Sequence, residues 1–147
     1  MKLISVLGTG DYGECKYKLN RKESVSCCFI QTSLNSLENF DRTFLFLTKA
    51  AKQKNFEKLK QEFEKFSIKT NIEGIDIPDG RNEGELWDIF EIIEENIEEK
   101  EEVWFDITHS FRSIPLIFFL LGSIYNLSLP LSFPLFFYPL LQRQDSA

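Results

Sequence analysis

Side chains that can bind an anion or move a proton gather in one short segment, Thr108–Ser113. The segment holds the chain's only histidine, His109, together with three hydroxyl groups and the guanidinium of Arg112. It follows an apolar run typical of a buried strand, Val103–Ile107, and an uncharged segment with helical character begins after Ser110. Open parallel sheets bind ligands at the carboxyl ends of their strands. The sequence therefore predicts a ligand-binding turn here.

The chemistry of this turn suits an anionic ligand. Ser110 can cap a helix whose free N–H groups favour an anion by about 0.3–1 kcal/mol. Arg112 can add a charge-assisted hydrogen bond worth about 1.5–3 kcal/mol. Taken singly, His109 could simply bond to backbone, and Arg112 could pair with a neighbouring acidic helix. The gathering of Thr108, His109, Ser110, Arg112 and Ser113 at one strand end favours the functional interpretation.

A glycine-rich loop, Gly8–Gly13, follows the apolar run Leu3–Leu7 and is the second candidate. Glycines let backbone N–H groups approach a phosphate or a base closely, while Asp11 and Tyr12 could bond to it or stack on it. A plain tight connection explains the same glycines equally well. The loop lacks the complete dinucleotide-binding fingerprint, and no acidic residue ends the second predicted strand, so a nicotinamide cofactor is disfavoured.

Apolar runs of strand length alternate with segments of helical spacing along the chain. This order predicts an α/β fold with a mainly parallel, right-handed, doubly wound sheet. The expected helices follow the N-cap Thr48, span Glu83–Glu99 and follow Ser110. The expected strands or extended segments are Leu3–Leu7, Val25–Gln31, Thr43–Leu47, Ile68–Ile77 and Val103–Ile107.

Composition narrows the class of protein. The 147 residues suit one domain, and 17 basic against 23 acidic residues argue against general DNA or RNA binding, which needs a broad basic face. Any anionic ligand must therefore be held by local positive charge. Cys15, Cys27 and Cys28 lack metal-ligand spacing, and the first residues lack a signal-peptide core. A reduced cytoplasmic setting, with no metal or cofactor, is expected.

An uncharged stretch from Ser113 to Gln142 raises the question of a membrane span. Its part Ile114–Leu131 is nearly long enough to cross a bilayer. Gly122 and Pro130 interrupt it, however, and it follows directly on the candidate ligand turn. We therefore expect core or dimer interface here, and no membrane association.

Four motifs occur in order and together resemble one known family. They are Leu7-Gly8-Thr9-Gly10-Asp11-Tyr12 with Tyr17; Leu47-Thr48-x-x-Ala51 with Asn55; Ile77-Pro78-Asp79-Gly80-x-x-Glu83-x-Glu85-Leu86-Trp87-x-Ile89-Phe90; and Asp106-Ile107-Thr108-His109-Ser110-Phe111-Arg112-Ser113-Ile114-Pro115. Over residues 3–125 the chain resembles the CARF domains of type III CRISPR systems. The resemblance implies a Rossmann-like sheet with helices on both faces, in a homodimer that binds cyclic oligoadenylate, most often the four-adenylate ring, across its two-fold axis.

The resemblance also implies roles for individual residues. Adenosines would lie in the loop of Gly8, Thr9, Gly10, Asp11 and Tyr12. The phosphates and ribose hydroxyls would be held by Thr108, His109, Ser110, Phe111, Arg112 and Ser113. A two-fold dimer matches a symmetric ring, and two copies of the Ser110 helix end and of Arg112 would supply local positive charge. We expect Trp87 to pack with Leu86 and Phe90 and not to stack on a base.

The chain also departs from the family pattern. Many relatives continue into a HEPN ribonuclease domain, marked by an arginine shortly before a histidine, but no arginine precedes His109 in this way. We therefore expect a CARF domain at 1–128 and an atypical hydrophobic, proline-rich tail at 129–147. Three prolines in 129–139 oppose a regular helix or central strand, so the tail is interpreted as a truncated or frame-shifted end, or as an arm on the partner subunit.

Two functional classes follow from the resemblance. In the first, the protein is a metal-independent ring nuclease: the adenylate 2′-hydroxyl attacks its own phosphate and leaves a 2′,3′-cyclic phosphate. His109, Ser110 or Thr9 would assist the proton transfers and Arg112 would stabilise the charge. In the second, the protein only binds the ring, as a sponge or as the sensor part of an effector. The first is preferred because a lone sensor domain has few other uses; an unrelated mononucleotide-binding protein is a third, weaker interpretation.

Overall fold

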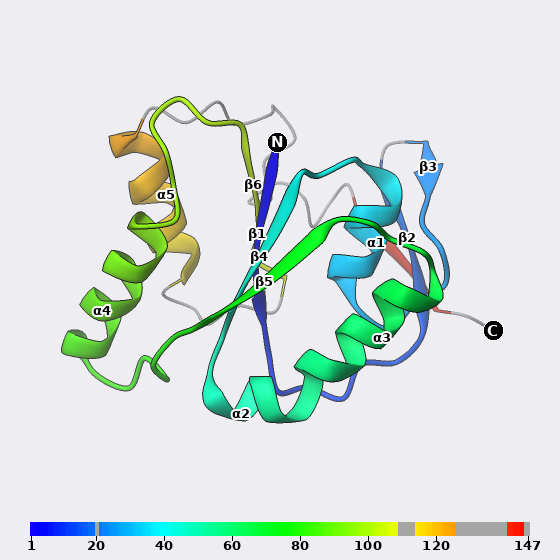
Figure 1. Cartoon of the computed structure of the whole chain (residues 1–147), viewed down its shortest axis with the longest axis horizontal. Coiled ribbons are helices and arrows are strands. Elements are labelled where there is room, and N and C mark those ends of the chain that lie inside the picture. The colour runs from blue at the N-terminus through cyan, green and yellow to red at the C-terminus, as the bar shows by residue number, and fades with distance from the viewer. Residues whose placement is uncertain (20, 109–113, 126–140, 146–147) are drawn as a thin grey trace.

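The central sheet consists of four parallel strands. A computed structural model describes residues 1–19, 21–108, 114–125 and 141–145. Within them the strand order is β5-β4-β1-β6, so β1 pairs on both sides (Figure 1). All six residues of β1 are buried, as expected of a parallel strand covered on both faces. The strands are β1 (Lys2–Leu7), β4 (Arg42–Leu47), β5 (Asn71–Asp76) and β6 (Val103–Asp106).

Helices cover both faces of the sheet, as Figure 1 shows. Side chains alternate between the faces with a period of two residues. Ile4, Val6 and Phe105 face α4 (Glu83–Glu94) and α5 (Ile114–Ile124), and the rings of Phe105 and Phe118 stack 4.3 Å apart. The other face carries Leu3, Leu7, Leu45, Leu47 and Trp104 and packs against α1 (Ile30–Leu37) and α3 (Glu57–Lys65). The predicted Rossmann-like α/β class is confirmed.

A small antiparallel sheet lies beside the main one. Its order is β3 (Lys22–Glu23), β2 (Cys15–Leu19) and β7 (Leu141–Asp145), and Cys15 pairs with Asp145. β2 was not predicted, although its alternation of buried Cys15, Tyr17 and Leu19 with lysines has the strand period. β7 belongs to the proline-rich tail expected at 129–147, of which residues 129–140 and 146–147 lie outside the described residues.

The predicted strand Val25–Gln31 is wrong. Only Cys27 makes a bridge, to Cys15, and α1 begins at Ile30. A short apolar run does not by itself distinguish a strand from a buried helix. Helical spacing places Ile30, Leu34 and Leu37 in one core cluster, and this packing decides for the helix.

The remaining elements agree with the predictions apart from their ends. Thr48 caps α2 (Lys49–Ala51) through a 3.3 Å hydrogen bond from Ala51 N. A π-helical turn, η1 (Lys52–Phe56), joins α2 to α3. The helix predicted over Glu83–Glu99 ends at Glu94, where the Asn96 side chain bonds back to the Ile92 carbonyl at 2.7 Å.

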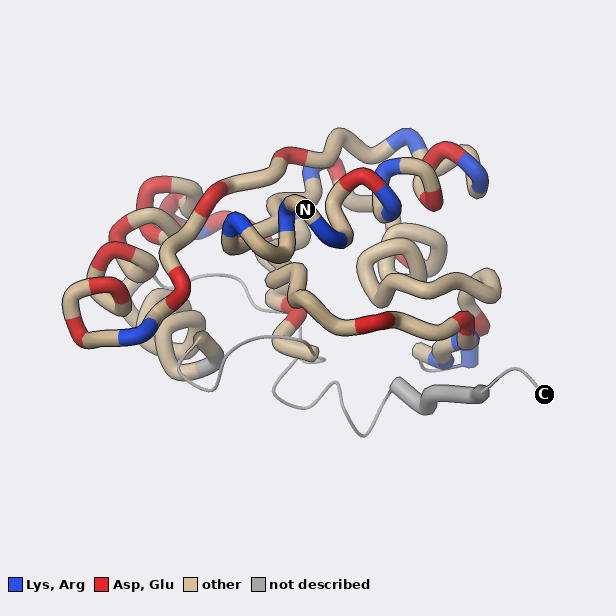
Figure 2. Tube along the Cα trace, turned by 90° about the horizontal axis from the view of Figure 1, so that it is seen from below, with Lys and Arg blue, Asp and Glu red and all other residues tan. Residues whose placement is uncertain are grey.

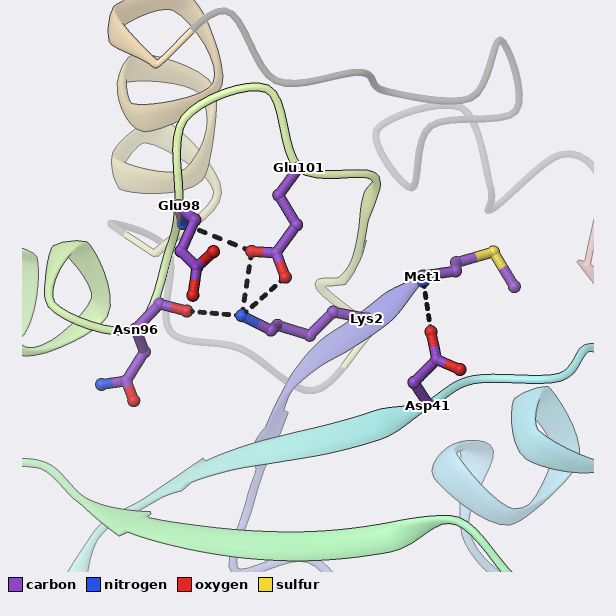
Figure 3. Close-up of polar contacts among 6 residues, drawn as sticks. All are labelled: Met1, Lys2, Asp41, Asn96, Glu98 and Glu101. Atoms are coloured by element: carbon purple, nitrogen blue, oxygen red, sulfur yellow. Dashed lines mark hydrogen bonds and ion pairs between the residues drawn. The ribbon is translucent and has the colours of Figure 1, made fainter.

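A polar cluster fixes the start of β1 at the amino edge of the sheet (Figure 3). Lys2 is 8% exposed; its Nζ donates to the Asn96 carbonyl at 3.0 Å and reaches Glu101 at 2.9 Å. The amino group of Met1 contacts Asp41 at 2.6 Å. The acidic and basic groups therefore neutralise one another at this edge.

α5 is the apolar segment considered above as a possible membrane span. It has 11 residues, with Ile114, Phe118 and Leu121 buried against the sheet. In the described part of the chain, no helix is long and apolar enough to cross a membrane.

Candidate functional site

The two predicted ligand segments follow neighbouring strands. β1 and β6 are parallel and pair in register, with Ser5 opposite Asp106. The loop after β1 and the turn after β6 therefore begin at the same carboxyl edge of the sheet. Gly8, Thr9, Gly10, Asp11, Tyr12 and Thr108 are described there, whereas His109, Ser110, Phe111, Arg112 and Ser113 lie outside the described residues.

Asn55 holds the glycine loop from the neighbouring helix. Its side chain is 3% exposed, and its Nδ2 donates to the carbonyls of Gly8 at 2.8 Å and Gly10 at 3.1 Å. In a trans peptide the next N–H points opposite to the carbonyl, and the described residues contain no cis peptide. The N–H groups of Thr9 and Asp11 are therefore directed away from Asn55. The loop carries its carbonyls inward and these two donors outward.

Tyr12 folds back over its own loop. Its ring lies tilted against Phe29 with centroids 5.4 Å apart. A Cβ atom at Gly10 would lie 3.1 Å from Tyr12 Cε1, so the glycine leaves room for this ring. Burial raises the pKa of Tyr12. The predicted freedom at Gly10 thus serves the close packing of Tyr12.

Lysines supply local positive charge beside the loop. Lys54 Nζ lies 2.8 Å from Asp11 Oδ1, and its hydrogen bond and charge lower the pKa of Asp11. Lys52 likewise contacts Asp76 at 2.8 Å. In Figure 2 basic positions gather on the α2–η1 segment, whereas acidic positions gather along α4. These lysines were not predicted as site residues, although their density after the Thr48 cap is a detectable signal.

A buried polar network lies beneath both segments. Ser5 Oγ donates to Asp106 Oδ2 at 2.6 Å, and Gln31 Nε2 donates to Ser5 Oγ at 2.8 Å. The backbone N–H of Thr108 donates to Asp106 Oδ1 at 3.0 Å. We call Gln31, Ser5 and Asp106 the Ser5 network. Ser5 and Gln31 were not predicted, although a serine inside the apolar run 3–7 is a detectable signal.

An apolar groove runs between α4 and α5. Its volume is about 440 Å³, and Leu86, Phe90 and Ile117 lie among its lining residues. The large hydrophobic side chains that are exposed in the described part of the chain all lie on these two helices: Trp87, Leu116, Phe119, Leu120 and Ile124. Trp87 meets the edge of Phe90 at 5.9 Å, as expected, but it is 59% exposed.

Comparison with known families decides the relationship. The family described as "CRISPR system endoribonuclease Csx1, CARF domain" matches residues 2–128. The chain belongs to the Csx1 CARF-domain family. This confirms the resemblance found in the four motifs, and it implies a role in CRISPR signalling through the sensing of cyclic oligoadenylate. Among curated proteins none matches the chain significantly.

At the carboxyl edge of the sheet, the acidic side chains of Asp11 and Asp106 already have partners within the CARF domain. Asp11 is paired with Lys54, and Asp106 accepts hydrogen bonds from Ser5 and Thr108. Thr9 and Thr108 are exposed. In the described parts of the CARF domain, no group of three His, Cys, Asp or Glu side chains could hold a metal ion.

Proposed function

We propose that two copies of this CARF domain bind one cyclic oligoadenylate, the four-adenylate ring, at their carboxyl edges. The observation that carries the proposal is the adjacency of β1 and β6, which places the Gly8–Tyr12 loop next to the turn that starts at Thr108. A ring with two-fold symmetry suits a site that two identical edges share.

Backbone donors and lysines support an anionic ligand. The outward N–H groups of Thr9 and Asp11 can approach a phosphate or the acceptor atoms of an adenine. Lys54 and Lys52 place two cations beside the loop, each paired with a carboxylate, on a chain whose net charge is −6. A ligand phosphate would therefore compete with Asp76 and Asp11 for these two lysines.

The α4–α5 groove supports a homodimer. Exposed apolar patches of this kind mark interaction surfaces, and α5 begins soon after the ligand turn. A two-fold axis beside α5 would bring the two ligand edges together. The rim of the groove is acidic at Glu83, so we place Leu116, Leu120 and Ile124 of α5 at the centre of the contact.

We further propose that the ring is cleaved without a metal. The ribose 2′-hydroxyl attacks the adjacent phosphorus, the P–O5′ bond breaks, and the 5′-oxygen leaves as a hydroxyl after taking up a proton. Holding the 2′-oxygen in line with the leaving oxygen supplies most of the acceleration. Thr9, His109 and Ser110 are the candidates for proton transfer, and Arg112 for stabilising the phosphorane.

Binding without cleavage is the second candidate function. It is favoured by the internal engagement of Asp11 and Asp106, which suits positioning more than proton transfer. In both cases we infer a reduced, cytoplasmic setting, in which Cys15, Cys27 and Cys28 remain free thiols.

Incubation with labelled cyclic tetra-adenylate in the presence of a chelator separates these functions. Bound, cyclic and linear species are resolved after short and long times. Linear product ending in a 2′,3′-cyclic phosphate is the expected result, and His109→Ala, Ser110→Ala and Arg112→Ala should each slow its formation. Intact ring that stays bound would establish the binding-only function, and absence of binding would refute both.

A further inference from the structure

The hydrogen bonds of the Ser5 network run in one direction. A carboxylate only accepts hydrogen bonds, so the single proton of the Ser5 hydroxyl is given to Asp106. Ser5 can then only accept, and Gln31 must present its NH2 group to it. This leaves Gln31 Oε1 buried and, within the described residues, without a hydrogen-bond partner. The orientation of the Gln31 amide is thus determined by Asp106, through the Ser5 hydroxyl.

Stability alone gives no reason for such a network in the core. Ser5 and Gln31 are completely buried and Asp106 is 4% exposed. The ion pairs between described residues do not include Asp106. A buried carboxylate and an unpaired amide oxygen both cost more than apolar side chains of the same size. Among the described residues, Asp106 is instead held by the Ser5 hydroxyl and the Thr108 backbone N–H, which ties β1 to the start of the turn after β6.

Each member of the network is linked to a ligand segment. Asp106 holds the backbone N–H of Thr108, where the turn after β6 begins. Ser5 lies on β1, which runs directly into the Gly8 loop. Gln31 stands in the first turn of α1, two residues after the N-cap Phe29, against which Tyr12 packs. The network thus joins β1, β6 and α1 through the hydrogen bonds of Ser5 to Asp106 and of Gln31 to Ser5.

We propose that Gln31, Ser5 and Asp106 are positioning residues that set the Thr108 turn against the Gly8–Tyr12 loop and thereby determine affinity for cyclic oligoadenylate. None of the three touches the ligand; they act through the two segments. The inference rests on the proposed function, because it assumes that both segments contact the ring.

Two substitutions separate positioning from electrostatics and from stability. Asp106→Asn removes a negative charge near an anionic ligand, so charge alone predicts tighter binding, whereas lost positioning predicts weaker binding. Gln31→Met removes the unpaired Oε1 together with the Nε2 hydrogen bonds to Ser5 Oγ and, at 3.5 Å, to the Val6 carbonyl. The melting temperature of Gln31→Met should then stay level or rise, while its affinity for cyclic tetra-adenylate falls. If Gln31 had only a structural role, melting temperature and affinity would fall together.

The matched control is Thr43→Val. Thr43 is also completely buried, and its Oγ1 donates to Asn35 Oδ1 at 3.1 Å, but it lies near the amino end of β4. This variant loses a buried hydrogen bond of the same kind far from the ligand edge. It should lower the melting temperature and leave affinity unchanged.

The experiment measures Kd for cyclic tetra-adenylate by calorimetric titration and melting temperature for each variant. We expect Asp106→Asn and Gln31→Met each to weaken binding about tenfold, which matches the loss of one hydrogen bond to a charged or coupled group. Hydrogen exchange at the Thr108 amide should accelerate in Asp106→Asn. Folded variants that bind as tightly as the wild-type chain would overturn the inference. Absence of binding by the wild-type chain itself would instead overturn the proposed function.

Discussion

At the residue scale, Asn55 is the side chain on which the shape of the glycine loop depends. It is buried and donates to both Gly8 and Gly10. Its position in a π-helical turn is consistent with a functional constraint, because such turns are frequent at functional sites. The sequence predicted its importance only through the motif, since the two carbonyl contacts depend on the fold.

Replacement of Asn55 by alanine should therefore release the loop. Two hydrogen bonds of about 0.5–1.5 kcal/mol each are lost, so affinity for cyclic tetra-adenylate should fall about tenfold or more. The matched control is Asn96→Ala, which removes an amide bonded to the Ile92 carbonyl near the amino edge. A titration in which Asn55→Ala and Asn96→Ala bind equally well would contradict this role.

Cys27 carries a second testable property at this scale. Burial raises the pKa of its thiol to about 12, from an ordinary value of 9.0. The folded chain thus keeps this proton above pH 9, whereas the unfolded chain releases it. The free energy of unfolding is unaffected by this group below pH 9 and should fall as the pH rises toward 12, by at most about 1.4 kcal/mol per pH unit.

Urea unfolding over this pH range measures that slope. In Cys27→Ser the hydroxyl can keep the contacts to Ser33 and Phe29 but does not titrate there. The variant should lose stability less steeply than the wild-type chain. Equal slopes would show that Cys27 is ionised in the folded protein at the same pH as in the unfolded one.

At the element scale, η1 is fixed by its contact with β5. The ring of Phe56 lies so close to Gly74 that a Cβ atom there would be 2.7 Å from Phe56 Cζ. A glycine inside a strand is otherwise unfavourable, so its place is explained by the approach of this ring. Phe56 is the neighbour of Asn55, which connects the packing of η1 to the glycine loop.

Gly74→Ala should accordingly act on stability and on the site together. Overpacking against Phe56 should cost about 1–3 kcal/mol of unfolding free energy and weaken the Asn55 contacts. Gly13→Ala is the control, because the added Cβ would have no atom within 4 Å beyond the glycine itself and its two chain neighbours. Chemical denaturation measures the difference, and a Gly74→Ala chain as stable as Gly13→Ala would exclude this explanation.

The elements differ in how well the sequence predicts them. β1, β4 and β6 were predicted because their apolar runs are buried on both faces, and α4 because its apolar residues recur at helical spacing. The run Val25–Gln31 was predicted to be a strand. Its last residues form a helix because Ile30, Leu34 and Leu37 pack against the sheet, and this tertiary contact cannot be seen in a short apolar run. The same holds for the Ser5 network, whose partners are distant in sequence.

At the scale of the whole molecule, the charge distribution and the apolar face on α4 and α5 are the features that bear on the proposed homodimer. Acidic residues dominate α4 and the turn after it, whereas one group of basic residues lies on the α2–η1 segment (Figure 2). A dimer contact through the apolar residues of α5 would leave the Gly8–Tyr12 loop and the lysines of the α2–η1 segment accessible to an anion. The lack of charge in this region predicted core or dimer interface, but not which side chains are exposed.

Leu120→Glu should disrupt this contact. Leu120 is 44% exposed, so the isolated domain should remain folded while a charge is placed in the interface. Sedimentation should show monomers, and affinity for cyclic tetra-adenylate should fall because half of the site is missing. Asn71→Glu adds the same charge at the exposed start of β5 and should remain dimeric. Dimeric Leu120→Glu would place the interface elsewhere.

The central claim is that two copies of the domain share one ring at their carboxyl edges. Native mass spectrometry of the wild-type chain mixed with cyclic tetra-adenylate tests it most directly. The account predicts a complex of two chains with one ring, and loss of that complex in Leu120→Glu. A single chain carrying its own ring, a pair of chains carrying two rings, or chains that carry none would contradict it.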